Sequence, residues 1–298
     1  MLVESSCCRV EPMVTLILPT YNYRAGIERT WESVRAFLVA PEQRLGRGGW
    51  EALFVCDGCT DGTDHWLIEA TRRADFAVRT LAYAHNRGKG YAVRLGLACG
   101  RGRFRLFTDV DLAYALTDVQ RLADELALGQ ADVVIGSREH PASRLTVPTR
   151  LQWHALRRSL QGRAFAAVVR CLLGLRYADT QAGLKGFTAT ALSRLLPHLR
   201  CDGFCVDCEM LWVSEWLGLR VAEVPVEVRY ESTASTTSLG TVAAMLLELW
   251  RLRRGWASKS TVGMLSALSL SRHVLPTDGQ PPTLARITRG TPSHHYCR

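Results

Sequence analysis

Short apolar segments alternate with longer amphipathic ones along the first 110 residues of the chain. Four segments have the length and aliphatic content of buried strands: residues 14–18, 51–56, 78–83 and 104–108. Three segments between them repeat apolar residues at helical spacing: residues 25–39, 64–74 and 89–99. Strands that alternate with helices in this way predict an α/β fold with a mainly parallel sheet and helices on both faces.

The pattern continues less regularly beyond residue 110. It predicts a strand at 132–136, a long arginine-rich helix at 151–173, a helix at 205–217 and an alternating strand at 220–228. We place all these elements in one domain at residues 13–240, which follows an N-terminal extension at 1–12.

A last amphipathic helix is predicted at 241–257. Its apolar residues form one stripe, with Arg251 and Arg254 on the opposite side: Val242, Met245, Leu249, Leu252 and Trp256. The stripe fits two interpretations, packing on the protein core or lying on a membrane surface. From 258 to 298 the apolar period fades, which predicts a basic tail without a fold.

The overall composition limits the class of protein. Hydrophobic residues make up 47% of the 298 residues and charged residues 22%, as in an ordinary globular protein. No apolar segment reaches the about 18 uninterrupted residues of a membrane span, and the N-terminus lacks the features of a signal peptide. These features predict a cytoplasmic protein whose ten cysteines are mostly thiols.

The net charge of +9 is concentrated near the C-terminus. Residues 251–298 hold eight basic residues and one acidic residue, so the first 250 residues carry 29 basic and 27 acidic ones. This nearly neutral body argues against a nucleic-acid partner, which would need a basic stripe on the folded surface. The tail fits either peripheral contact with an anionic membrane or simple solvation.

Polar residues follow each predicted strand. They are Asn22 after the first strand, Asp57 and Asp61 after the second, residues 86–89 after the third, and Asp109 with Asp111 after the fourth. Each group alone is typical of a turn. Because the carboxyl ends of parallel strands meet at one edge of a sheet, the four groups together predict a ligand site there.

Asp109 and Asp111 are the strongest candidates for metal binding. They are separated by one residue and follow an apolar strand, so both carboxylates can reach one cation directly or through water. Carboxylate oxygens suit Mg²⁺ or Mn²⁺. A cation that bridges a diphosphate neutralises charge on a leaving group.

The segment 86–90 predicts an anion site at a helix N-terminus. Its glycines allow backbone amides to approach an anion, and Arg87 and Lys89 add positive charge. The chain has neither a Walker loop nor a Gly-x-Gly-x-x-Gly segment after its first strand, which argues against P-loop ATPases and dinucleotide oxidoreductases.

Eight segments, in order, resemble the family 2 glycosyltransferases, and within that family the enzymes that make dolichyl- or polyprenyl-phosphate glucose and mannose. They are LILPTYN, VCDGCTDGT, NRGKGYAVRLG, TDVDL, VIGSR, DTQAGLKGF, VDCEML and EVPVEV, within residues 14–230. The resemblance implies a GT-A fold, a nucleotide-sugar donor, Mg²⁺ or Mn²⁺ at Asp109 and Asp111, and inversion at the anomeric carbon. The segment NRGKGYAVRLG favours UDP-glucose over GDP-mannose.

The resemblance also implies roles for particular residues. The donor would contact Pro19, Tyr21, Asn22, Asp57, Asp61, Arg87, Lys89, Asp109, Gln181 and Lys185. An acceptor phosphate would contact Arg138, Arg150, Arg157 and Arg158. Asp207, Glu209 and Arg138 would take part in catalysis, and Asp109 and Asp111 would hold the metal.

Two kinds of acceptor remain open. A polyprenyl phosphate is already an anion, so arginine side chains that position it matter most. A hydroxyl group of a soluble natural product would need Asp207 or Glu209 as general base. These two carboxylates also fit a plain charge pair at a helix N-terminus. A binding module without turnover is a further interpretation, against which the intact Asp109 and Asp111 argue.

The chain departs from the family pattern at several positions, among them Tyr23 in place of an acidic residue and Val110 in place of a small one. Cys56 stands where the family usually has the first of two aspartates, and Ser232–Ser238 replaces the usual Ser-Lys element. Cys56 and Cys59 have the spacing of a redox or zinc-binding pair, or are packing residues. A rival function comes from three further cysteines with the spacing of a radical-SAM iron-sulfur site: Cys201, Cys205 and Cys208.

Overall fold

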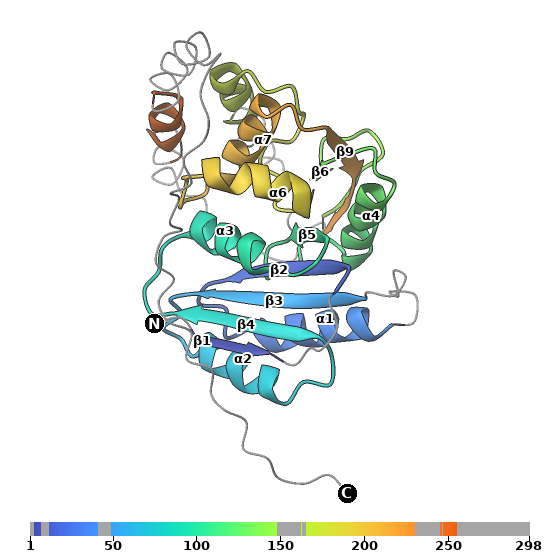
Figure 1. Cartoon of the computed structure of the whole chain (residues 1–298), viewed down its shortest axis with the longest axis vertical. Coiled ribbons are helices and arrows are strands. Elements are labelled where there is room, and N and C mark those ends of the chain that lie inside the picture. The colour runs from blue at the N-terminus through green and yellow to red at the C-terminus, as the bar shows by residue number, and fades with distance from the viewer. Residues whose placement is uncertain are drawn as a thin grey trace, which may run out of the picture.

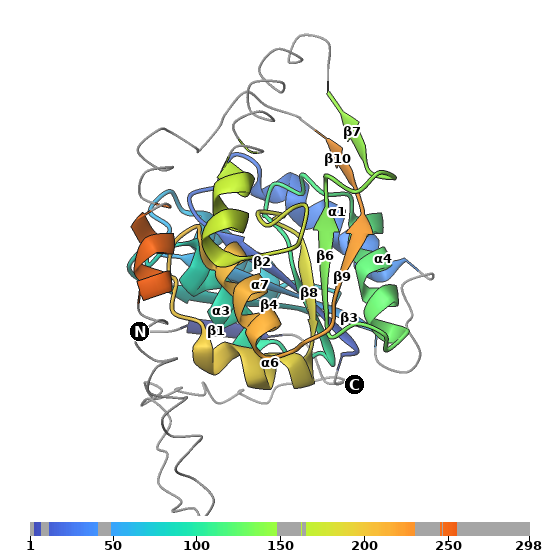
Figure 2. The same cartoon turned by 90° about the horizontal axis from the view of Figure 1, so that it is seen from above.

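The chain folds around one large sheet in the computed structural model, which describes residues 3–6, 12–40, 49–147, 162, 165–229, 245 and 247–254 (Figure 1). Within these residues the strand order of the sheet is β1-β4-β3-β2-β5-β8-β6-β9. The strands are β1 (Val3–Ser6), β2 (Val14–Thr20), β3 (Trp50–Asp57), β4 (Val78–Tyr83), β5 (Phe104–Phe107), β6 (Val133–Ser137), β8 (Lys185–Thr188) and β9 (Val221–Pro225). A short parallel pair, β7 (Arg144–Thr146) with β10 (Glu227–Arg229), extends beyond the sheet (Figure 2).

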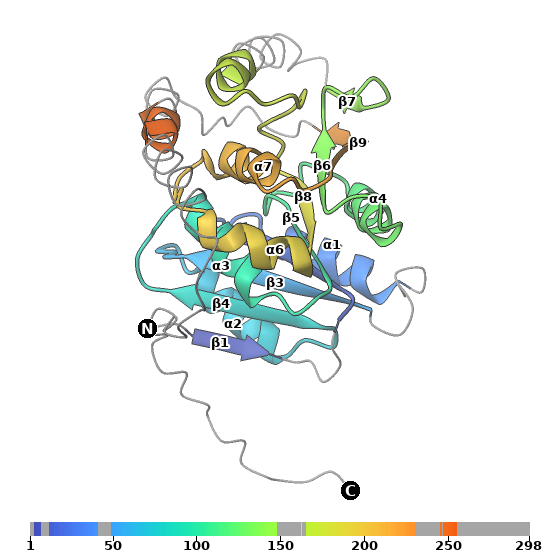
Figure 3. The ribbon, with the colours of Figure 1, turned by 45° about the horizontal axis from the view of Figure 1, so that its top comes forward.

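Helices cover both faces of the sheet (Figure 3). One face carries α3 (Lys89–Cys99), α6 (Ala189–Leu195), which η3 (Leu196–His198) continues, and α7 (Val206–Trp216). The other face carries α1 (Ile27–Val39), α2 (Thr63–Arg72) and α4 (Leu116–Ala127). Alternate residues of β2 serve the two cores, because Ile17 is buried with α3 whereas Leu16 and Leu18 are buried with α1. The predicted α/β architecture is confirmed.

The direction of β8 decides which segments meet at the predicted binding edge. Strands β2, β3, β4 and β5 run parallel, so their carboxyl ends lie at the same edge. Strand β8 runs antiparallel between β5 and β6, with Lys185 opposite Phe107. The chain therefore enters β8 where β5 ends, and the residues before β8 lie beside those after β5.

Most predicted elements are confirmed to within a few residues. The strand predicted at 220–228 is divided, because β9 pairs with β6 and β10 pairs with β7. The extension at 1–12 contributes β1, an edge strand antiparallel to β4. The sequence analysis does not predict the short strands β1, β7 and β8, nor the helices α4 and α6.

The C-terminal helix packs on the core with part of its predicted stripe. Residues 245 and 247–254 are helical, and Met245 and Leu249 are buried in the same core as α7. Leu247 and Trp250 lie on the exposed side. Core packing accounts for the described part of the stripe, and membrane contact stays a prediction.

Two further predictions, the helix at 151–173 and the tail at 258–298, fall partly or wholly outside the described residues. Of the helix predicted at 151–173, residues 162 and 165–173 are described and are helical. Residues 148–161, with Arg150, Arg157 and Arg158, lie outside the described part, as does the tail at 258–298. Among the described helices, none combines the length and the apolar character needed to cross a bilayer.

Candidate active site

Four charged side chains form a chain of ion pairs at the edge where β5 ends and β8 begins. The Lys89 Nζ atom lies 2.8 Å from Asp109 Oδ1 and 3.5 Å from Asp207 Oδ2. The Lys185 Nζ atom lies 2.6 Å from Asp207 Oδ1. We call these residues, in the order Asp109, Lys89, Asp207, Lys185, the charge chain.

The charge chain runs from the surface into the core. The side chain of Asp109 is 40% exposed, that of Lys89 18% and that of Lys185 0%. Burial alone would lower the pKa of Lys89, but the charges of Asp109 and Asp207 outweigh it and raise that pKa above its usual value. Lys89 is therefore a fixed cation, and the outer end of the chain, Asp109, is the one that a solute can reach.

Four secondary-structure elements supply the charge chain. Asp109 follows β5, Lys89 opens α3, Asp207 lies in the first turn of α7, and Lys185 opens β8. A carboxylate in the first turn of a helix is also favoured by the helix dipole. The antiparallel β8 and the packing of α3 beside α7 bring together residues that are far apart in the sequence.

Lys185 lies beneath the site rather than on its surface. Its ammonium group donates hydrogen bonds to Asp207 and to the Ala182 carbonyl, and it lies 5.8 Å from the centroid of the Phe107 ring. Predicted as a donor contact, Lys185 is here a buried counterion that holds Asp207 in place.

Glu209 occupies a different environment from Asp207, although two positions separate them. Glu209 is fully buried, and its two oxygens accept hydrogen bonds from the backbone amides of Arg200 (2.9 Å) and Cys201 (2.8 Å). Burial raises the pKa of Glu209, and these hydrogen bonds oppose the rise. Glu209 thus fixes the segment before α7, at a position away from the charge chain.

The loop at 86–90 is held by acceptors of the protein itself. Asp57 accepts hydrogen bonds from the backbone amides of Arg87 (2.7 Å) and Gly88 (3.0 Å), and the Asp202 carbonyl accepts one from Gly90 (2.8 Å). Three of the amides in the predicted anion site, those of Arg87, Gly88 and Gly90, therefore donate to acceptors of the protein. A Cβ atom on Gly88 would lie 2.3 Å from the Asp202 oxygen, so glycine serves close packing here.

The two positive side chains of that loop differ in their exposure to solvent. Lys89 belongs to the charge chain, and the guanidinium group of Arg87 stacks on the Tyr91 ring, 3.7 Å from its centroid. Arg87 is exposed at the rim. Both predicted donor-binding cations thus lie at the binding edge of the sheet.

The loops that follow β2 and β3 are tied to each other. Asn22, whose φ of +45° suits asparagine, accepts a hydrogen bond from the Thr60 amide at 2.8 Å. Asp61 accepts hydrogen bonds from the amides of Arg24 (2.9 Å) and Thr63 (3.0 Å). Slight burial acts to raise the pKa of Asp61, but the hydrogen bond from the Thr63 hydroxyl, together with those from the two amides, lowers it. Asn22 and Asp61 therefore hold these loops in shape. Tyr21, two residues after Pro19, is exposed in the loop that follows β2.

Asp109 and Asp111 supply two carboxylates, the type of ligand that suits a divalent cation. One oxygen of Asp109 meets Lys89, and the other faces Gly183, where a Cβ atom would lie 2.4 Å away. Asp111 is exposed and accepts a hydrogen bond from the Ala113 amide at 3.1 Å. The described residues contain no group of three His, Cys, Asp or Glu placed to hold a metal. Two carboxylates suit Mg²⁺ or Mn²⁺ if a diphosphate and water complete its ligands.

Arg138 is fixed by a bidentate ion pair with Asp179. Its Nε and Nη2 atoms donate hydrogen bonds to Asp179 at 2.7 and 2.9 Å, and its backbone amide donates a third at 3.1 Å. The Asp179 side chain is buried, whereas that of Arg138 is 36% exposed. The pair presents a rigid cation at the end of β6.

Three residues absent from the sequence prediction complete the site. Asp179 holds Arg138, Gly183 makes room for Asp109, and buried Tyr114 accepts a hydrogen bond from the Gly183 amide at 3.2 Å. Burial raises the pKa of Tyr114, which keeps it protonated. Asp179 and Gly183 belong to the segment DTQAGLKGF, whose resemblance to the family could have pointed to them. No feature of the sequence pointed to Tyr114.

Residues 15–184, more than half of the chain, match the family described as Glycosyl transferase family 2. The chain belongs to this family. Three relatives are dolichyl-phosphate β-glucosyltransferases. That of Drosophila melanogaster is 31% identical over 221 residues, that of Saccharomyces cerevisiae 29% over 232, and that of Dictyostelium discoideum 28% over 217. Each alignment covers 72% of this chain but 65–66% of the relative, so the chain spans slightly less than two thirds of their length.

Solved structures share the GT-A fold of this family member. Glucosyl-3-phosphoglycerate synthase from Mycobacterium tuberculosis, in complex with UDP, has a TM-score of 0.55 and 20% identity, with 81% of this chain and 80% of that chain covered. The same enzyme with Mn²⁺, UDP-glucose and phosphoglyceric acid also gives a TM-score of 0.55 at 20% identity, with the same coverage. The predicted GT-A fold is confirmed.

The radical-SAM alternative is wrong for this glycosyl transferase family 2 protein. Its three cysteines lie two thirds along a GT-A fold, and each thiol contacts a different residue outside the cysteine group. Cys201 contacts Glu248, Cys205 donates to the Met245 carbonyl at 3.1 Å, and Cys208 accepts a hydrogen bond from Gln181. All three are buried packing residues. Gln181, predicted as a donor contact, holds Cys208 beside the charge chain.

Proposed function

We propose that this protein is a metal-dependent, inverting hexosyltransferase that moves glucose from UDP-glucose to a polyprenyl or dolichyl phosphate. The observation that carries the proposal is the charge chain, whose exposed end, Asp109, stands beside Asp111 at the binding edge of a family 2 fold. The names of the relatives support glucose and a dolichyl phosphate.

The loops after β2, β3 and β4 are proposed to bind the nucleotide sugar. Asn22, Asp57 and Asp61 hold these loops in place through the hydrogen bonds described above. Arg87 and Lys89 add positive charge where a diphosphate would approach the sheet edge. Pro19, Tyr21 and Gln181 are proposed to line the same pocket.

Asp109 and Asp111 are proposed to hold Mg²⁺ or Mn²⁺ together with the diphosphate. The cation would neutralise charge that develops on the departing diphosphate. Lys89 is already fixed beside Asp109 and, from the protein side, supplies a second positive charge to the same group. Lys185 and Asp207 keep Lys89 in position, because their buried ion pair anchors the inner end of the charge chain.

Arg138 is proposed to orient the acceptor phosphate. An oxygen of that phosphate attacks the anomeric carbon and forms the new C–O bond, while the bond from that carbon to the diphosphate breaks and its electron pair leaves with UDP. Such a single displacement inverts the configuration. Because the phosphate is already an anion, no side chain must accept a proton. Asp207 then acts by positioning Lys89, and Glu209 by fixing the segment before α7.

A lipid acceptor also implies contact with a membrane surface. We propose peripheral contact from the cytoplasmic side, through the basic C-terminal region. The exposed face of the helix at 247–254 supports this proposal, because it combines Leu247 and Trp250 with the cations of Arg251 and Arg254.

A donor and acceptor screen tests the proposal. Purified protein is incubated with UDP-glucose or GDP-mannose, with Mn²⁺, Mg²⁺ or EDTA, and with or without polyprenyl phosphate in detergent, and the released UDP or GDP is measured. We expect release from UDP-glucose that requires both the cation and the lipid phosphate. Preference for GDP-mannose would contradict the donor. Full turnover on a soluble hydroxyl acceptor without lipid would favour the natural-product alternative.

A further inference from the structure

Two cysteines that contact each other stand at the end of β3 and in the loop that follows it. Cys56, near the end of β3, is fully buried, and Cys59, three residues later, is partly exposed. Their thiols are hydrogen-bonded to each other. The backbone agrees with this contact, because Cys59 Sγ lies 3.6 Å from the Thr20 carbonyl and Thr20 is the register partner of Cys56.

The two thiols differ in the way that dithiol chemistry requires. The hydrogen bond from Cys56 lowers the pKa of the Cys59 thiol, so the exposed sulfur is the better nucleophile. The same contact, with burial, raises the pKa of the Cys56 thiol. Another contacting pair, Cys201 with Cys205, is buried at both positions, so a reagent reaches neither sulfur.

The loop around these cysteines carries anchors of the proposed nucleotide pocket. Asp57 holds the amides of Arg87 and Gly88, and Thr60 donates its amide hydrogen to Asn22. Between the cysteines, Gly58 has a φ of +62°, and a Cβ atom there would lie 2.2 Å from the Asn86 nitrogen. The loop is therefore already packed against residue 86 and cannot move further in that direction.

We propose that Cys56 and Cys59 form a redox-active dithiol, and that its oxidation to a disulfide closes the proposed nucleotide pocket to the donor. The second clause depends on the proposed function, whereas the first does not.

The oxidant in this scheme is a small-molecule disulfide such as oxidised glutathione. The Cys59 thiolate attacks one sulfur of that disulfide, forms a mixed disulfide and releases one glutathione thiolate. The Cys56 thiolate then attacks the Cys59 sulfur and releases the second. Two protein thiols are oxidised by two electrons, and one disulfide is reduced to two thiols, which carry away both protons.

In this scheme, closing the bond displaces the loop. The two sulfurs have to approach from hydrogen-bond contact to about 2.05 Å. Because Cys56 is fixed in the strand and Gly58 is packed against residue 86, the movement falls on Cys59 and on the residues that follow it. Cys59 leaves the Thr20 carbonyl, and the Thr60 amide moves with it away from Asn22.

Redox titration of the full chain tests both clauses. The protein is equilibrated with reduced and oxidised glutathione in varied ratio, free thiols are blocked, and disulfides are assigned by peptide mass mapping. Binding of UDP with Mn²⁺ is measured by calorimetry on the same samples. We expect a Cys56–Cys59 disulfide, UDP affinity at least about fivefold weaker than in reduced protein, and full recovery after reduction.

Variants separate this pair from the other cysteines. In Cys59→Ser, and in Cys56→Ala as a second variant, UDP affinity should no longer depend on the glutathione ratio. The control Cys171→Ser removes an exposed single thiol outside the loop and should keep the full response.

Each of the other outcomes would overturn one part of the proposal, either the dithiol or the closure of the pocket. Absence of the Cys56–Cys59 disulfide under oxidising conditions would overturn the dithiol. A disulfide that leaves UDP affinity unchanged would overturn the closure of the pocket. If the reduced protein binds no UDP, the proposed donor site and the closure fail together, while the peptide map still decides on the dithiol.

Discussion

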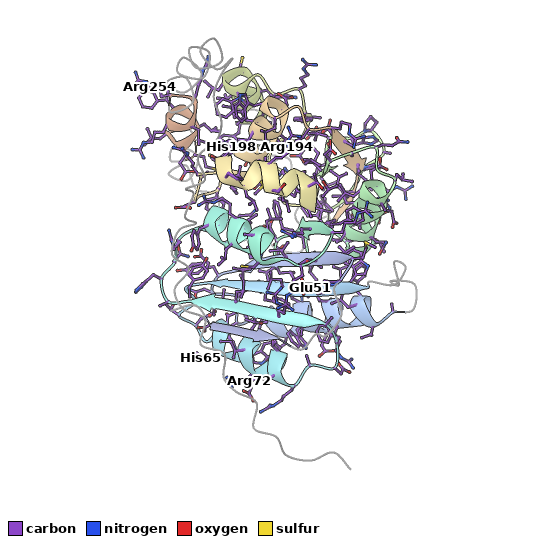
Figure 4. All side chains as sticks on the ribbon, viewed as in Figure 1. Glu51, His65, Arg72, Arg194, His198 and Arg254 are labelled. Atoms are coloured by element: carbon purple, nitrogen blue, oxygen red, sulfur yellow. The ribbon has the colours of Figure 1, made fainter. Side chains whose placement is uncertain are left out.

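Two clusters of charged side chains lie at opposite edges of the same sheet. At the amino ends of the strands, Glu51 on β3 accepts hydrogen bonds from Thr15 (2.7 Å) and the Arg101 amide (3.1 Å) and pairs with Arg79 at 3.5 Å. Figure 4 shows Glu51 within the sheet layer. The side chains of Glu51 and Arg79 are 0% and 4% exposed. This cluster is closed to solvent.

The charge chain at the carboxyl ends of the strands is open. It also pairs buried charges, but its outer member, Asp109, is exposed. Its four residues are positioned by four separate secondary-structure elements. The closed cluster ties loops to strands through backbone amides and therefore stabilises the fold. The open one holds charged groups where a ligand can reach them. We infer that a network of buried charges is a candidate functional site where one end of the network meets solvent, as at Asp109.

The strongest test of this contrast is Glu51→Ala in the closed cluster. The substitution leaves Arg79 buried without its carboxylate, so we expect the free energy of unfolding to fall by about 3–5 kcal/mol, measured by urea denaturation. Turnover per folded molecule should stay the same. Glu51→Gln, which keeps a hydrogen-bond acceptor, should lose less. Loss of turnover at unchanged stability would break the comparison.

Asp109→Asn in the charge chain should lower turnover and leave the stability of the fold nearly unchanged. We expect UDP release from UDP-glucose to fall about 10²- to 10³-fold, because one carboxylate of the proposed metal and diphosphate site is lost. The free energy of unfolding should change by less than about 1 kcal/mol, because the side chain is partly exposed. Asp124→Asn, on the surface of α4, is the matched control and should change neither quantity. Unchanged turnover in Asp109→Asn would contradict the proposed metal and diphosphate site.

Asp179→Asn tests the comparison on two arginine–aspartate ion pairs that have the same bidentate geometry, one at the candidate site and one on the surface. Arg138 with Asp179 is bidentate at the site, and Arg220 with Asp132 is bidentate on the surface, at 3.0 Å for both bonds. Asp179→Asn should raise the KM for polyprenyl phosphate about tenfold, a loss of about 1.4 kcal/mol.

The control Asp132→Asn should leave the KM for polyprenyl phosphate unchanged and cost less than about 1 kcal/mol of stability. Equal effects of both substitutions on KM would show that Arg138 has no special role toward the acceptor.

The smallest expected effect is on the pH dependence of stability. Burial acts to raise the pKa of Asp179, but hydrogen bonds and charge from Arg138 outweigh it, so that pKa lies below its usual value. Such a group stabilises the fold above its unfolded pKa of about 3.9, and this stability is lost as the pH falls through the folded pKa. The difference in unfolding free energy between wild type and Asp179→Asn should therefore be constant near neutral pH and shrink below about pH 4. A constant difference throughout would contradict this account.

Local patterns in the sequence determined much of the fold and the position of the site. The periods of apolar residues place β2 to β5 and α1 to α3, because strand and helix periods depend on residues a few positions apart. The polar residues after those strands then mark the binding edge, since parallel strands share it. The motif segments add family membership.

Only the tertiary structure decided which of those polar residues act together. Lys89 and Asp207 are 118 positions apart, and their contact depends on the antiparallel entry of β8 and on the packing of α7 beside α3. Long-range packing also gives Asp207 and Glu209 different partners and provides acceptors from β3 and from the segment before α7 for the amides of Arg87, Gly88 and Gly90. Strand order and long-range packing choose among chemically equivalent carboxylates and amides, and no local period contains that information.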